Sequence, residues 1–120
     1  MKLLEGTKVL SIDWLMTKII IIRKRKELCY LNEENDLRID MAHWDYTNGF
    51  CQVFDHPTYG KHFAIFLRRK DRFVIIHESI HIVHMIFDYK GIPMSLENTE
   101  TVAYMITHIC ETLFNMNMKE

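Results

Sequence analysis

The chain has 120 residues, of which 48% are hydrophobic and 26% are charged; this composition is typical of a globular domain and excludes a disordered or fibrous chain. Its 15 lysines and arginines are balanced by 16 aspartates and glutamates, so the formal net charge of −1 argues against bulk nucleic-acid binding. The three cysteines, Cys29, Cys51 and Cys110, are scattered without a Cys-x-x-Cys pair, which indicates a reducing compartment.

Residues 1–68 predict mainly β-strands, because runs of β-branched and aromatic residues alternate with turn-forming segments. The predicted strands are 8–14, 18–23, 28–31, 37–42, 50–54 and 62–67. Basic runs at 23–26 and 68–70 flank these strands. They could contact a phosphate backbone or an acidic partner, but a solvated turn is the favoured interpretation, so we expect no nucleic-acid partner.

Residues 72–89 predict a helix with one polar face. A buried strand is the alternative, because the segment is rich in β-branched residues. A strand would separate Glu78 from His77 and His81 and would sort polar from apolar residues poorly. In a helix, the polar residues instead lie along one face and nearly all other positions are apolar. Gly91 suits the C-terminal cap of this helix. The helix is therefore favoured.

The string His77-Glu78-x-x-His81 within this helix has the spacing of a zinc site. Residues four apart lie on one helix face, so two imidazoles can share one ion while the adjacent glutamate reaches a metal-bound water. Zinc lowers the pKa of that water to about 7, and a carboxylate can take its proton during attack on a carbonyl. The string predicts His77 and His81 as zinc ligands and Glu78 as the general base.

A second helix is predicted over 96–114, with Ser95 as N-cap and a short preceding turn that favours an antiparallel neighbour. The polar residues on one face of this helix either face solvent or form the other side of the zinc site. Two histidines leave zinc under-coordinated, so we expect a third ligand on this face: Glu100, with Glu97 in reserve. Tyr104, one turn beyond, could donate to a developing oxyanion; the alternative is a half-buried tyrosine bonded to the backbone.

Cys51 offers a different third ligand. Peptide deformylases combine an upstream cysteine with H-E-x-x-H, and the order here would match, although their other motifs are absent. His84 is a weaker candidate, because it lies seven residues from His77, about 10 Å along the helix axis. A supporting or core role is favoured for it.

The segments 77–81 and 97–104 resemble the small zinc-dependent metallopeptidases of the H-E-x-x-H…E type, which include the ImmA/IrrE-like peptidases and short phage-encoded proteins of the same plan. In that family the acidic ligand begins a second helix and is followed by small and aromatic residues, as Glu100 is followed by Ala103 and Tyr104 here. The resemblance covers roughly 62–114. It implies a minimal zincin-like fold with bound Zn²⁺, in which a strand such as 62–67 lies along the cleft and pairs with extended substrate.

These elements predict an α+β fold over 1–120: a small N-terminal β-sheet, the H-E-x-x-H helix and a second, antiparallel helix, without a linker or repeat. Residues 14–22 are too short and too polar to span a bilayer, and 1–6 do not lead into a signal peptide, so we expect no membrane partner. The expected location is the cytoplasm, meaning the host cytoplasm if a phage encodes the chain.

Two classes of function follow. The first is a zinc-dependent hydrolase that cuts a peptide or protein substrate, with Glu78 activating a metal-bound water. The second is a non-catalytic, phage-type interaction protein that keeps a zinc-bound zincin fold to bind a host or phage partner. The intact Glu78 favours the first class, because structural zinc sites usually close all four positions with protein ligands.

Overall fold

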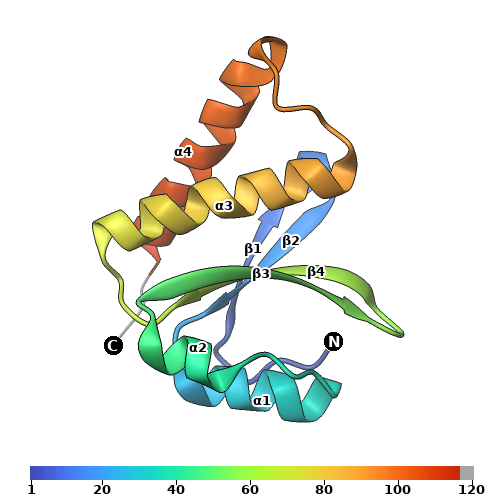
Figure 1. Ribbon diagram of the computed structural model, residues 1–120, viewed down its shortest axis with the longest axis vertical. Coiled ribbons are helices and arrows are strands. Elements are labelled where there is room, and N and C mark those ends of the chain that lie inside the picture. Colours follow the sequence, from blue (N-terminus) through green and yellow to red (C-terminus); the bar gives the residue numbers. More distant parts are fainter. Residues whose placement is uncertain (117–120) are drawn as a thin grey trace.

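A four-stranded mixed sheet lies between two helical layers in the computed structural model, which describes residues 1–116 (Figure 1). The last four residues of the predicted 1–120 domain lie outside this description. The strands are β1 (Lys8–Ile12), β2 (Thr17–Ile22), β3 (Gly49–His56) and β4 (Gly60–Leu67), in the order β1-β2-β4-β3. β2 and β4 are parallel, and the other two pairings are antiparallel. This arrangement confirms the predicted α+β class.

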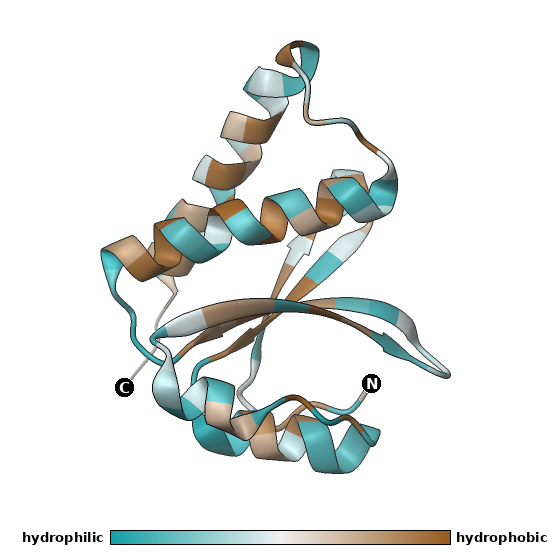
Figure 2. Cartoon of the chain, viewed as in Figure 1, coloured by the Kyte–Doolittle hydropathy of each residue, from teal (hydrophilic) through white to brown (hydrophobic). Residues whose placement is uncertain are grey.

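The two faces of the sheet are covered by different helices (Figure 1). The helices are α1 (Arg25–Asn35), α2 (Met41–Tyr46), α3 (Arg72–Lys90) and α4 (Thr99–Asn115), with short 3-10 turns at Asp13–Leu15 and Leu96–Asn98. α1 and α2 pack on one face, and α3 and α4 pack on the other. Ile19 and Ile21 of β2 point to the second face while Ile20 and Ile22 point to the first, so this strand is apolar on both sides. In Figure 2, much of the middle of the sheet is brown, and along α3 brown residues alternate with teal ones.

Two of the six predicted strands are wrong, and residues 1–68 are less uniformly β than expected. The predicted strand 28–31 lies within α1. A four-residue apolar run does not distinguish strand from helix, and the helix is started by Glu27, whose Oε1 accepts from the backbone N–H groups of Arg23 and Lys24 at 2.8 and 2.9 Å.

The predicted strand 37–42 is irregular chain that leads into α2. The side chain of Asn32 occupies the backbone groups that a strand neighbour would use: its Nδ2 donates to the carbonyl of Ile39 at 2.9 Å, and its Oδ1 accepts from the N–H of Ile39 at 3.0 Å. Asp40 then caps α2, accepting from the backbone N–H of Ala42 at 2.9 Å.

The helix predicted over 72–89 is confirmed as α3, which removes the strand alternative. The Asp71 side chain caps its start by accepting from the N–H groups of Phe73 and Val74, and Gly91 ends it with a left-handed φ of 71°.

None of the helices within residues 1–116 combines the length and apolar character needed to cross a membrane.

The second predicted helix is present as α4, but its relation to α3 differs from the expected antiparallel pairing. Met105, Ile109 and Leu113 bury the later turns of α4 in the core that includes α3. Figure 1 shows α4 crossing α3 obliquely, with its first turns standing away from that helix. The apolar residues that dock α4 begin after its first turn, so the turn that carries Glu100 is not held against α3.

Candidate metal centre

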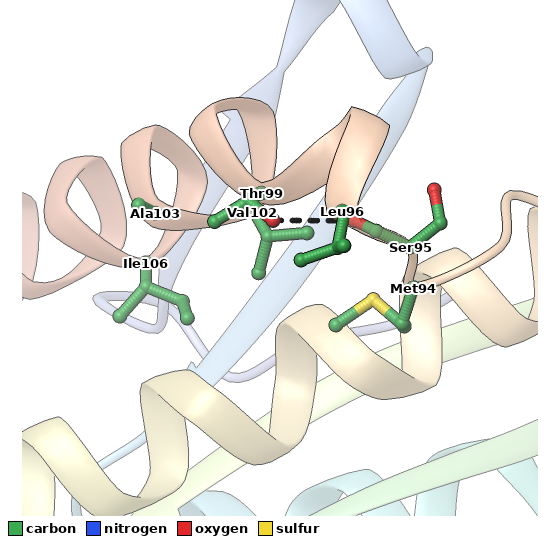
Figure 3. Close-up of a pocket in the computed structure, with 7 residues that line it drawn as sticks. All are labelled: Met94, Ser95, Leu96, Thr99, Val102, Ala103 and Ile106. Atoms are coloured by element: carbon green, nitrogen blue, oxygen red, sulfur yellow. Dashed lines mark hydrogen bonds between the residues drawn. The ribbon is translucent and has the colours of Figure 1, made fainter.

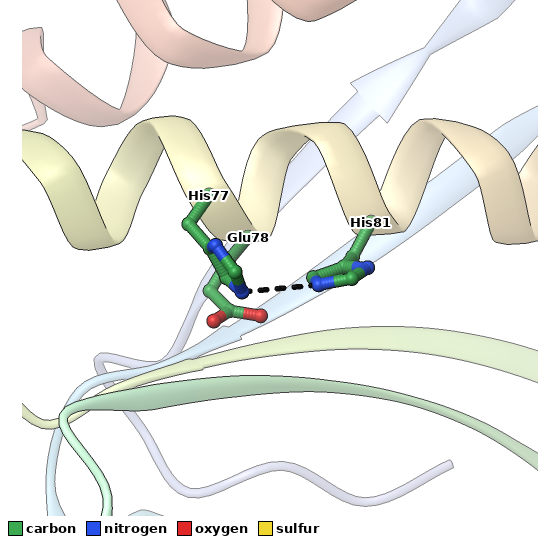
Figure 4. A group of neighbouring side chains, drawn as sticks. All are labelled: His77, Glu78 and His81. Atoms are coloured by element: carbon green, nitrogen blue, oxygen red, sulfur yellow. Dashed lines mark hydrogen bonds between the residues drawn. The ribbon is translucent and has the colours of Figure 1, made fainter.

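His77, Glu78 and His81 lie together on α3, as the i, i+4 spacing requires (Figure 4). Their donor atoms all lie within 4.8 Å of one another, and within residues 1–116 no other group of three or more histidine, cysteine or acidic side chains is placed to hold a metal ion. The Nε2 atoms of His77 and His81 are 3.0 Å apart. Two nitrogens bound to one tetrahedral zinc at about 2.0–2.1 Å would lie roughly 3.4 Å apart, so a small opening of the pair admits an ion.

The three side chains differ in exposure, and the difference suits their predicted roles. Both imidazoles are exposed, whereas the Glu78 side chain is buried at 5% exposure. An ion could therefore reach the histidines from solvent. The carboxylate lies deeper, between α3 and the sheet, where its position is restricted.

A cavity of about 270 Å³ opens at this point between α3 and the start of β3. The residues that line it are Gly49, Phe50, Cys51, His77, Glu78, His81 and Met85. Of these residues, Gly49, Phe50 and Met85 were not predicted from the sequence. A glycine at the start of a strand is the one signal that points to a close approach of the backbone.

The strand beside the site is β3, not the predicted 62–67 segment. That segment forms β4, which pairs with β2 on one side and β3 on the other, so its backbone groups are already engaged. β3 is one of the two edge strands of the sheet, and within the described chain it pairs with β4 alone. The strand that lies along the cavity is therefore β3, and not 62–67.

Gly49 allows β3 to approach α3 directly beneath the site. A Cβ atom at this position would lie 2.6 Å from Val74 Cγ1, 3.0 Å from the carbonyl oxygen of Phe66 and 3.3 Å from Glu78 Cγ. The first of these distances is too short for any real contact, so a side chain here would force the strand and the helix apart.

We expect the substitution Gly49→Ala to lower the free energy of unfolding by about 1–3 kcal/mol, the usual cost of adding a methyl group to a filled space. Denaturant unfolding followed by circular dichroism would measure the loss. Because Val74→Ala removes the nearest atom, the double variant should be more stable than the sum of the two single losses predicts. Wild-type stability in Gly49→Ala would contradict the close approach.

Cys51, on β3, makes two contacts with Glu78 on α3. Its Sγ lies 3.1 Å from the backbone carbonyl oxygen of Glu78 and 3.4 Å from the carboxylate Oε1. Burial raises the pKa of the Cys51 thiol far above its usual range, and the neighbouring Glu78 charge raises it further, so the sulfur carries its proton. Cys51 was the alternative third ligand; it lines the cavity, but its sulfur is not part of the three-residue donor group.

The structure does not bring the predicted residues of the second helix to this site. Glu97, in the 3-10 turn before α4, and Glu100, on α4, are exposed, and Tyr104 on α4 is 69% exposed. Figure 4 shows the His77, Glu78 and His81 side chains pointing toward the strands, whereas α4 lies on the other side of α3.

Two imidazole nitrogens, a carboxylate and a solvent-open cavity suit a divalent cation that accepts nitrogen and oxygen ligands, and Zn²⁺ is the common choice for such a set. A water beside such an ion would lie within reach of Glu78, which is the arrangement that hydrolysis needs. Comparison of the chain with protein-family models, with curated proteins and with solved structures finds no match.

Proposed function

We propose that this chain is a zinc-dependent hydrolase of peptide bonds, with His77 and His81 as zinc ligands and Glu78 as the general base. The observation that carries the proposal is the gathering of these three donors within 4.8 Å beside a cavity open to solvent. When bound, the ion supplies Lewis acidity and a water of lowered pKa. The chain contributes a buried carboxylate next to that position, which takes the proton as the water attacks.

The proposed substrate is a peptide or protein segment in extended conformation. The support comes from β3, which is an edge strand and whose first residues line the cavity. An extended peptide could add to this edge through backbone hydrogen bonds and so place a scissile carbonyl near the histidine pair. The reaction is proposed to take place in the cytoplasm, that of the host if a phage encodes the chain.

Zinc-loaded protein incubated with a mixture of peptides of diverse sequence would test this proposal. Mass spectrometry should show cleavage products that disappear with a chelator and return when zinc is restored. A protein that binds zinc and cleaves none of the peptides would favour the second function described below.

We assign the remaining protein ligand to Glu100, on the resemblance to the H-E-x-x-H…E peptidases. In the described structure Glu100 is exposed and is not part of the donor group, so coordination requires the first turns of α4 to move toward His77 and His81. Those turns are exposed: Leu96, just before the helix, is 94% exposed and Tyr104 is 69% exposed. Such a movement would also displace Val102 and Ile106, which are partly buried against the core.

The third ligand is testable by competition for zinc with a chromogenic chelator. We expect Glu100→Ala to weaken zinc affinity at least about tenfold and Glu97→Ala to change it less than about threefold, the pattern of a ligand against a bystander. Cys51→Ala serves as the control for a ligand on β3. A large loss in that variant, with none in Glu100→Ala, would move the ligand to Cys51.

A non-catalytic interaction protein is the second candidate, and the exposed apolar side chains near α4 favour it. A second cavity of about 450 Å³ lies along the start of α4 (Figure 3). It is lined by Met94, Ser95, Leu96, Thr99, Val102, Ala103 and Ile106. Of these residues, Met94 is 44% exposed and Leu96 is 94% exposed. Grouped exposed apolar residues are typical of surfaces that bind other proteins, and here the partner would be a host or phage protein.

A further inference from the structure

The start of β3 contacts Glu78 at three points along its length. Gly49 lies under the side chain, where an added Cβ would be 3.3 Å from Glu78 Cγ. The Cys51 sulfur lies 3.4 Å from the carboxylate Oε1 and 3.1 Å from the backbone carbonyl oxygen of the same residue. The start of β3 therefore contacts the backbone, the aliphatic part and the carboxylate of Glu78.

We infer that Cys51 is a positioning residue for Glu78: its thiol donates a hydrogen bond to the carboxylate and, with Gly49 packed beneath the stem, fixes the base beside His77 and His81. This inference rests on the proposed hydrolase function and adds to it a residue that acts through Glu78.

The Glu78 carboxylate depends on this contact because it has little else to hold it. Within residues 1–116, Cys51 is the one hydrogen-bond donor to that carboxylate. A glutamate side chain has several rotatable bonds, and ordering them loses entropy that local contacts must offset. A buried carboxylate with one donor is thus sensitive to removal of that donor.

The thiol proton has two acceptors, and both belong to Glu78. The backbone carbonyl lies inside α3, where helical hydrogen bonding already engages it. An ionised carboxylate is the stronger acceptor, since hydrogen bonds to charged groups are about twice as strong as neutral ones. Rotation of the thiol hydrogen toward Oε1 is therefore the favoured arrangement, and the sulfur stays in contact with the helix backbone at the same time.

A double-mutant cycle on the full chain tests the contact without reference to activity. We expect Cys51→Ala and Glu78→Ala to be non-additive by at least about threefold in the equilibrium constant for unfolding, because each removes the same interaction. Cys110→Ala with Glu78→Ala is the matched control: Cys110 is a half-buried cysteine on α4, and this pair should be additive within about twofold. Additive losses for Cys51 and Glu78 would overturn the inference.

Steady-state kinetics test the effect on the reaction. In zinc-loaded protein with wild-type metal content, Cys51→Ala should lower kcat at least about tenfold and leave KM within about twofold, because the base is displaced while substrate contacts remain. Cys51→Ser keeps a donor at the same position and should recover most of kcat. A cysteine that only fills space would not give this rescue.

The two arms separate failure of the inference from failure of the proposed function. Unchanged kcat in Cys51→Ala, in an active enzyme, would overturn the positioning role even if the cycle showed coupling. A zinc-loaded wild type that hydrolyses no peptide would instead reject the hydrolase, and the cycle would still decide whether Cys51 holds Glu78. If Cys51→Ala does not fold, a cycle of Cys51→Val with Glu78→Ala decides the contact by the same criterion, because valine fills the space of the thiol but cannot donate a hydrogen bond.

Discussion

Replacing His81 with alanine is expected to abolish zinc binding by the chain. The two Nε2 atoms lie 3.0 Å apart on one exposed face of α3, so together they can chelate one ion, and a single imidazole holds zinc far more weakly. Purified wild-type protein should contain about one zinc per chain after loading, and the variant should contain none. Elemental analysis after gel filtration would measure both.

Thermal stability gives a second measure of the same loss, because binding to the folded state stabilises it. At a free zinc concentration of about 100 times Kd, wild-type protein should gain roughly 2.7 kcal/mol, a rise in Tm of roughly 10 °C, whereas His81→Ala should gain nothing. His84→Ala is the matched control, since His84 is exposed on the same helix and lies outside the donor group. Wild-type protein that takes up no zinc on titration would reject the metal centre.

Replacing Glu78 with glutamine is expected to leave zinc binding and the fold intact while lowering kcat/KM for peptide cleavage at least about a hundredfold. Glutamine keeps the size of the buried side chain but cannot take a proton from water, and general-base catalysis typically contributes 10²–10⁴-fold. Zinc content and cleavage rate measured on the same samples would separate the two effects.

Loss of zinc from Glu78→Gln would give a different mechanism. The carboxylate lies within 4.8 Å of both histidine nitrogens, so a direct bond to the ion is geometrically within reach. In that case Glu78 is a ligand and the general base is another group. Equal cleavage by Glu78→Gln and wild type would remove the base assignment while leaving the ligands in place.

Local features of the sequence predicted the site better than they predicted its surroundings. The histidine pair follows from helical spacing alone, and α3 was predictable because its apolar pattern is long and ends at Gly91. The predicted strand 28–31 failed because four apolar residues carry no period, and the deciding contact is the Glu27 carboxylate on the backbone ahead of α1.

The contributions of β3 were not predictable from spacing. Gly49 and Cys51 reach Glu78 only because β3, at one edge of the sheet, passes beneath α3, and strand order is set by packing of the whole domain. The direction of α4 likewise depends on where Met105, Ile109 and Leu113 find the core. Helical periodicity identifies that face but gives no crossing angle.

The contacts at the site fall into two groups by sequence separation, one short and one long. His77 and His81 are four positions apart, so one helical turn is enough to bring them together. Cys51 and Glu78 are 27 positions apart and meet only when β3 has docked against α3. A non-local contact of this kind forms only after the intervening chain has paid its loop-closure entropy, and local unfolding can break it without unwinding a helix. Local opening of β3 would therefore keep His77 and His81 in register while it removed the surroundings of the Glu78 carboxylate. In the proposed hydrolase, binding the ion would then need less of the domain to be ordered than cleaving a peptide does.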